Sequence, residues 1–279
     1  MSSLHFSAYS FKSLPDHQEL ATRITEELYQ DSRVSGVYLS GSFARGKPDK
    51  YSDLDFYIIV PEGKKQEIIL SHRELFSKVG KIATLFPATH LDDPHQIIAF
   101  YKTSIPIHVD FNYKVLSEIT VRPKDKHAVI LFDRGGSLSK LKDSWQSLSE
   151  TAKPTRDDLQ YFEDRFWGWC WYAFSKIERG ELWEARDTGE YLRNNVLIKL
   201  AYFLTELPYE GSRRLEQKLP KEMLDQLEEG LPVEHTREAY LLSLRKSIKM
   251  YQDLMQKIIE KEGLEIAEVD RNYFVMSFD

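Results

Sequence analysis

The sequence predicts an α+β fold in which a small mixed β-sheet flanked by helices is followed by a helical bundle. Up to about residue 133, amphipathic stretches alternate with short β-branched and aromatic runs, a pattern typical of interleaved helices and strands. After the pair Gly135-Gly136 the periodicities become long and helical. With 279 residues, 42% of them hydrophobic, the chain can bury a core. We therefore expect two domains, residues 1–135 and 136–279.

The elements of the first region follow from local patterns. A helix is expected over residues 15–30, where Leu20, Ile24 and Leu28 repeat every fourth residue. A turn-rich segment at 41–52 separates two apolar strands. In chain order, strands are expected at 34–39 and 54–60, a helix at 64–79, and strands at 81–86, 105–112 and 128–132.

The second region reads as a bundle of long helices. They are expected at 137–150, 155–179, 181–206 and 236–262, with Pro154, Gly180 and Pro208 as breaks. The final stretch, residues 265–279, fits either a strand or an extended tail, and both remain open.

Composition excludes several classes of protein. The longest apolar stretch, near residues 166–174, is far shorter than the roughly 20 residues of a membrane-spanning helix. The N-terminal residues do not resemble a secretory signal, and a single Cys170 allows no internal disulfide, so we expect a cytoplasmic protein. The net charge is -6 and no basic stripe is present, so no nucleic-acid partner is expected. A homodimer is left open.

The residues with the clearest chemical meaning begin at the end of the first strand. Gly41 lets the backbone turn sharply and approach a ligand closely. The residues after it, beginning with Ser42, would start a short helix whose N–H groups form a phosphate site.

The second strand opens with Asp53 and Asp55, which share one face because strand residues i and i+2 point the same way. Two like charges about 4 Å apart repel by roughly 4 kcal/mol at an effective dielectric near 20. A divalent cation relieves this repulsion, and Mg²⁺ prefers hard oxygen ligands. Zinc is disfavoured because His and Cys clusters are absent from the sequence.

A third acid is expected on the strand at 105–112. Its alternation places His108, Asp110 and Asn112 on one face, and Asp110 is the best candidate. If this strand lies beside that of Asp55, three carboxylates converge as in two-metal phosphoryl or nucleotidyl transfer.

These residues resemble a known family. The pattern is similar to the nucleotidyltransferase superfamily that includes DNA polymerase beta, and more narrowly to the bacterial antibiotic nucleotidyltransferases that act on aminoglycosides and lincosamides. The resemblance implies Mg²⁺-dependent transfer of a nucleoside monophosphate, from ATP or another NTP, to a hydroxyl of a small molecule, with release of pyrophosphate. The matching residues are Gly41-Ser42, Arg45-Gly46, Asp53-Leu54-Asp55 and Asp110.

The resemblance also implies individual roles. Ser42 and the N–H groups after Gly41 would hold the β- and γ-phosphates, helped by Arg45 or Lys47. Two magnesium ions would be held by Asp53, Asp55 and Asp110. Asp110 would also act as general base, although some members of the family use a Glu elsewhere. The acceptor would bind between the two regions, and its modification would confer antibiotic resistance.

Simpler interpretations stand beside these. Asp53 could cap a turn, Asp110 could be an ordinary edge residue, and Arg45 and Lys47 could be surface charges. His108 is more typical of a strand histidine than of a ligand. The acids between residues 163 and 190 fit solvated helix faces, although they could also attract a cationic substrate.

The sequence also partly fits other function classes. Residues 41–47, GSFARGK, fit the first seven positions of a P-loop, which would indicate a kinase or NTPase. Pro48 stands where a P-loop needs a hydroxyl, and no substantial helix follows. A protein adenylylating enzyme and a non-catalytic nucleotide-binding or interaction module remain alternatives.

Overall fold

The computed structural model divides the chain into two compact units, residues 1–149 and 150–279. It describes residues 13–91, 93–120, 123–149, 151, 153–267 and 269–275. The division lies after helix α4 (Ser137–Gln146), which packs on strand β6 (Val129–Asp133) and on the 3-10 helix η4 (Pro123–His127) of the first unit. The sequence placed this boundary at 135/136, because the change to helical periodicity begins with α4.

The first unit is built on a mixed sheet, as the sequence predicted, but the sheet has six strands where five were expected. Strands β2 and β5 pair in parallel, whereas all other neighbouring strands pair antiparallel. The order across the sheet is β3-β4-β5-β2-β1-β6. The other strand bounds are β1 (Gly36–Leu39), β2 (Leu54–Ile59), β3 (Ile82–Ala88), β4 (Asp93–Tyr101) and β5 (Ile107–Lys114).

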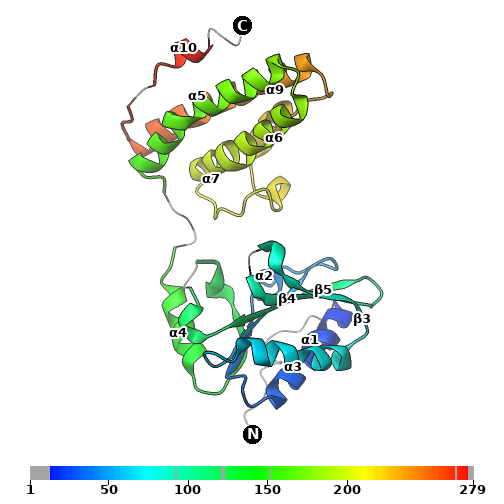
Figure 1. The fold of residues 1–279 in the computed structure, drawn as a ribbon. Coiled ribbons are helices and arrows are strands. Elements are labelled where there is room, and N and C mark those ends of the chain that lie inside the picture. Colours follow the sequence, from blue (N-terminus) through cyan, green and yellow to red (C-terminus); the bar gives the residue numbers. More distant parts are fainter. Residues whose placement is uncertain are drawn as a thin grey trace. The chain divides into compact units, whose positions relative to one another are not determined.

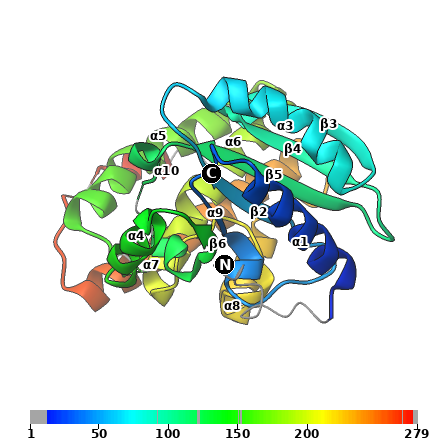
Figure 2. The ribbon, with the colours of Figure 1, turned by 90° about the horizontal axis from the view of Figure 1, so that it is seen from below.

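Helices α1 (Pro15–Gln30) and α3 (Lys65–Val79) cover one face of this sheet (Figure 1). Figure 2 looks onto that face, and both helices lie over the strands. The apolar residues spaced every fourth position along α1 are buried against the sheet. Phe76 of α3 stacks on Phe111 of β5, with ring centroids 3.9 Å apart. We call this the packed face.

Among the described residues of the first unit, the cover of the opposite face of the sheet is only partial. Beside β6, α4 places Leu138 and Trp145 against Tyr38 and Ile59 in a small second core. Away from α4, this face carries polar side chains of β2, β4 and β5. We call it the open face, and it positions the candidate site.

Strand β4 was not predicted. Its segment begins Asp93-Pro94-His95, residues typical of a turn, and only a short apolar run follows. The strand nevertheless pairs with both β3 and β5, so its backbone groups are satisfied on both sides. Strand β5 runs from Ile107 to Lys114, two residues further along the chain than predicted, since it starts after Pro106.

The second unit is helical, as predicted. Helix α5 (Arg156–Glu178) starts with a capping box, in which Thr155 and Asp158 satisfy each other's backbone N–H groups. Its Phe166 stacks on Tyr251 of α9 (Arg237–Glu262) with centroids 3.6 Å apart. Cys170 is fully buried in this core. No helix among the described residues is long and apolar enough to span a membrane.

The helix expected at 181–206 consists of three consecutive pieces. Helix α6 (Leu182–Leu192) passes through a π-helical turn (Arg193–Leu197) into α7 (Ile198–Thr205). Helix α8 (Lys221–Glu229) was not predicted, and within the stretch left open at 265–279 a short helix α10 (Arg271–Val275) forms. Residues 268 and 276–279 of that stretch lie outside the described residues. Short helical turns occur at α2 (Gly41–Ala44), η2 (Thr89–Leu91), η3 (Leu116–Glu118) and η6 (Leu215–Gln217).

Candidate active site

The turn after β1 brings its backbone against the carboxylate of Asp55. Gly41 has a φ of 71°, a conformation that residues with a side chain rarely adopt. A Cβ atom added there would lie 1.9 Å from Asp55 Oδ2. The backbone N–H of Ser40 also donates to the Asp55 carbonyl oxygen at 3.0 Å. Gly41 is therefore required both by its conformation and by the space that Asp55 occupies.

Ser42 is the most buried polar group of this turn. It is 3% exposed, and among the described residues its Oγ has no hydrogen-bond partner. Leaving a buried hydroxyl unsatisfied costs free energy, which a bound acceptor atom would recover. Arg45, half-buried, and Lys47, exposed, follow on the same loop.

Helix α2 ends at Ala44 after a single turn. It is too short for a large macrodipole, so an anion here would depend on side chains and individual backbone groups. It is also too short for a P-loop, which continues into a substantial helix.

The turn before β2 holds Asp53 at the start of the strand. Asp49 fixes that turn, because its carboxylate accepts from the backbone N–H of Tyr51 at 2.9 Å and its own N–H donates to Ser52 Oγ at 2.9 Å. His17 of α1 contacts the Ser52 carbonyl oxygen at 3.0 Å. Side chains on both sides thus anchor the chain just ahead of Asp53.

The parallel pairing of β2 with β5 brings the predicted acids together. Asp55 and Asp110 are register partners on neighbouring strands, so both side chains emerge on the open face. Ligand atoms of Asp53, His108 and Asp110 all lie within 4.8 Å of one another. The structure therefore places Asp110 beside the other two acids. Their roles in catalysis and metal binding remain predictions.

Two further side chains contact Asp110. His108 Nε2 lies 3.2 Å from Asp110 Oδ1, and its ring stacks on Phe100 of β4 with centroids 4.7 Å apart. The interaction with Asp110, aided by the charges of Asp53 and Asp55, raises the pKa of His108. Gln96 of β4 donates from Nε2 to the same Oδ1 at 3.0 Å. Strand alternation had already placed His108 on this face. No sequence pattern indicated Gln96 as a site residue, because β4 was not predicted.

The arrangement concentrates negative charge on hard oxygen atoms. Three carboxylates face one imidazole, at the edge of a turn that presents a buried hydroxyl. Such a donor set suits a hard divalent cation and the phosphate oxygens that bind with it.

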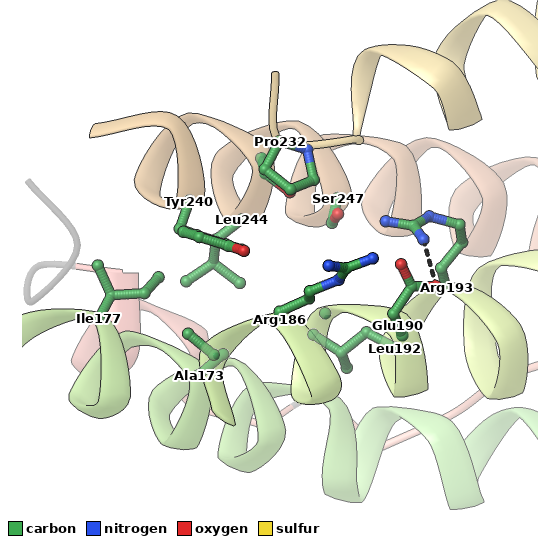
Figure 3. Close-up of a pocket in the computed structure, with 13 residues that line it drawn as sticks. Ala173, Ile177, Arg186, Glu190, Leu192, Arg193, Pro232, Tyr240, Leu244 and Ser247 are labelled. Atoms are coloured by element: carbon green, nitrogen blue, oxygen red, sulfur yellow. Dashed lines mark hydrogen bonds and ion pairs between the residues drawn. The ribbon is translucent and has the colours of Figure 1, made fainter. Parts of the chain in front are cut away.

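The second unit offers a small pocket between α5, α6 and α9 (Figure 3). In it, Glu190 pairs with Arg193 at 2.7 Å, at the point where the π-helical turn begins. Arg186 also lines this pocket. Its volume of about 20 Å³ holds roughly one water molecule, which excludes a ring-sized substrate.

Most acids of α5 and α6 that could have attracted a cationic substrate have structural partners. Lys176 binds Glu181 at 2.7 Å and Glu184 at 3.2 Å. Glu163 is buried and accepts from the Tyr251 hydroxyl at 2.8 Å. These contacts favour the simpler interpretation of the acids as parts of the helix packing.

Comparison with known proteins gives a family match over most of the chain. A family model described as streptomycin adenylyltransferase matches residues 15–275. Among solved structures, an aminoglycoside 6-adenyltransferase from Bacillus subtilis is 12% identical, with a TM-score of 0.45, covering 92% of this chain and 95% of that one. A nucleotidyltransferase-like protein from Exiguobacterium sibiricum is 13% identical, with a TM-score of 0.38, covering 88% and 77%. A search of curated proteins found no match.

Proposed function

Because the chain belongs to the streptomycin adenylyltransferase family and is thus a nucleotidyltransferase, we propose that it transfers AMP from ATP to a hydroxyl of an antibiotic. The acceptor is an aminoglycoside of the streptomycin type. Its hydroxyl oxygen attacks the α-phosphorus, the bond to the β-phosphate bridging oxygen breaks, and pyrophosphate leaves.

One observation carries this proposal beyond the family match. Asp53, Asp55 and Asp110 gather on the open face, directly beside a glycine turn in which the Ser42 hydroxyl is buried without a partner among the described residues. Acids at this spacing repel each other, so their convergence is best explained by a cation that they share with a phosphate ligand.

The residues present fit magnesium. Asp53, Asp55 and Asp110 supply carboxylate oxygens of the kind that Mg²⁺ prefers. They would hold up to two ions, and the bound metal supplies charge neutralisation for the phosphates.

The turn between β1 and β2 would bind the triphosphate. Ser42 Oγ donates to a phosphate oxygen. The lack of a side chain on Gly41 leaves room for the Asp55 carboxylate beside the turn. Arg45 and Lys47 add positive charge on the same loop. This positioning accounts for much of the rate enhancement in phosphoryl-transfer reactions.

Asp110 is the proposed general base. Gln96 and His108 both contact its Oδ1. Oδ2 is therefore the oxygen that takes the proton from the acceptor hydroxyl as the new oxygen–phosphorus bond forms.

The test is incubation of the purified chain with MgATP and single acceptors, followed by mass spectrometry of the acceptor and assay of the released phosphate. Streptomycin, other aminoglycosides and a lincosamide are the acceptors. We expect a mass gain of one AMP on an aminoglycoside, with pyrophosphate as the co-product.

Release of ADP would instead indicate a kinase, and a gain of AMP on a protein side chain would indicate a protein adenylylating enzyme. Asp53→Asn serves as the inactive control. The division of roles expected from the sequence, catalysis in residues 1–135 and acceptor binding in 136–279, stays a prediction.

A further inference from the structure

We propose that a polar cleft on the open face of the first unit binds the acceptor ring that carries the reacting hydroxyl. The cleft has a volume of about 270 Å³ and is lined by side chains of β1, β2, β4 and β5 and of the η2 and η3 segments. This inference rests on the proposed nucleotidyl transfer, and it names the place where the acceptor meets the carboxylates.

The cleft adjoins the carboxylates along the strands. Tyr57 and Asn112, which line it, are the next register partners on the same face after Asp55 and Asp110. Two strand residues span about 7 Å, so a ring in the cleft brings a hydroxyl within reach of Asp110. Gln96 joins the two places, since it lines the cleft and donates to Asp110 Oδ1.

The direction of transfer explains why the acceptor occupies this side. Strand β1 runs antiparallel to β2, so the Gly41–Ser42 turn lies at the end of β2 where Asp53 enters. The cleft lies at the opposite side of the acids, toward Tyr57. Nucleotidyl transfer needs the attacking and leaving oxygens roughly in line. With the phosphates at the turn, the attacking hydroxyl must arrive from the cleft.

The lining suits a ring that bears hydroxyl groups. Asp93 and Lys114 form an ion pair at 2.7 Å, and Glu118 pairs with Lys65 at 2.6 Å, so the charged groups near the cleft are balanced. Together with Gln96, these side chains offer both donors and acceptors. Recognition here would therefore depend on hydroxyl pattern more than on net charge.

One wall is aromatic. Tyr57 lines the cleft and stacks on Tyr38, which is 1% exposed and supports it from behind, with centroids 4.7 Å apart and planes 7° from parallel. A rigid aromatic surface accepts the C–H face of a saturated ring. The volume falls just below the roughly 300–1,000 Å³ of whole-ligand pockets, so the cleft takes one ring of a larger acceptor.

A nucleobase could also stack on this wall. The ribose of ATP, however, joins the α-phosphorus outside the line between the attacking and leaving oxygens. The position opposite the phosphate turn thus belongs to the acceptor.

Filling the cleft with a large side chain tests the proposal. Leu91 lines the cleft and is 57% exposed, whereas Leu70 of α3 on the packed side is 55% exposed, so the two are matched sites. For Leu91→Trp we expect the KM for streptomycin to rise roughly tenfold or more, with the KM for MgATP unchanged. Leu70→Trp should change neither constant. Thr120→Trp fills the cleft from another wall and should reproduce the effect of Leu91→Trp.

The outcomes separate the two proposals. If the wild-type chain transfers no AMP to any aminoglycoside, the proposed function fails. If the wild type is active but both cleft variants keep its KM for the acceptor, or raise the KM for MgATP instead, the cleft assignment is wrong.

Discussion

The two faces of the six-stranded sheet share the same backbone but differ in what covers them. On β2, Leu54 and Phe56 are fully buried under α1 and α3, whereas Asp55 and Tyr57, the residues that alternate with them, face the opposite side. The packed face fixes the strands in position, and the open face uses that rigidity to hold like charges close together. Substitutions on the two faces should therefore have different consequences, which the following experiments test.

The largest effect is expected on the open face. Asp53→Asn should lower kcat/KM for AMP transfer at least about 1,000-fold, equivalent to roughly 4 kcal/mol, because a carboxylate proposed to hold the cation shared with the phosphates is lost. Removing one of three clustered acids should leave the free energy of unfolding unchanged or raise it. Steady-state kinetics and urea titration of the same preparation measure both. If Asp53→Asn lost its activity because it unfolds, the proposed difference between the two faces would be wrong.

On the packed face we expect the reverse. Phe111 is fully buried and stacks on Phe76, so Phe111→Ala should lower the free energy of unfolding by about 3 kcal/mol or more. The activity per folded molecule should fall much less than in Asp53→Asn. Phe111→Leu, which leaves a smaller cavity, is the control. If fully folded Phe111→Ala and Phe111→Leu lost kcat/KM to the same extent, the packed face would affect catalysis directly and not only through stability.

The turn at Gly41 lies against Asp55 on the open face, and its substitution should have the next largest effect. Gly41→Ala combines a φ of 71° with a Cβ atom 1.9 Å from Asp55 Oδ2, and we expect about a 100-fold loss of kcat/KM. Gly46→Ala is the matched control, because Gly46 has a φ of 68° but nothing within 4 Å of the added atom. It should cost stability only. Similar kinetics of the two variants would mean that strain, and not displacement of Asp55, is responsible.

The smallest predicted effect concerns a polar group within the packed face. His72 is buried, contacts Asp31 at 3.0 Å and the Tyr113 hydroxyl at 2.7 Å, and burial lowers its pKa below the usual 6.5. The unfolded chain therefore binds more protons just below pH 6.5, and stability should fall as pH falls from 6.5 toward the lowered value. The slope cannot exceed about 1.4 kcal/mol per pH unit for one proton. His72→Gln should be less stable at pH 7, and its urea midpoint should vary less between pH 7 and 5. If the urea midpoint of His72→Gln varied with pH as steeply as that of the wild type, the pH dependence would belong to another group.

Sequence reasoning reached the acids of the site because their signal is local. The spacing of Asp53 and Asp55 fixes their shared face, and alternation puts Asp110 and His108 together on one face of β5. The pairing of β2 with β5 had to be assumed, since register depends on contacts distant in sequence. The contact of Gln96 with Asp110 and the collision that makes Gly41 irreplaceable exist only after three strands and a turn have met.

The fold likewise was predictable where the sequence signal is local and was missed where it is not. Helix α1 has the predicted bounds because Pro15 stands at its first turn and its apolar positions are evenly spaced. Strand β4 was hidden by its polar start, and the short α8 lacks a long periodicity. The π-helical turn after Leu192 adds no change in composition that a sequence pattern could detect.

The parallel pairing of β2 and β5 also sets the order in which a growing chain can complete the site. A parallel neighbour cannot follow through a tight hairpin, and here the connection contains α3, β3 and β4. Asp55 therefore leaves the ribosome well before Asp110, and the two meet only after the whole connection between β2 and β5 has been made and β5 has paired with β2. A nascent chain that stops before β5 should fold α1 and the β1–β2 hairpin without gathering the acids, and so should not retain nucleotide.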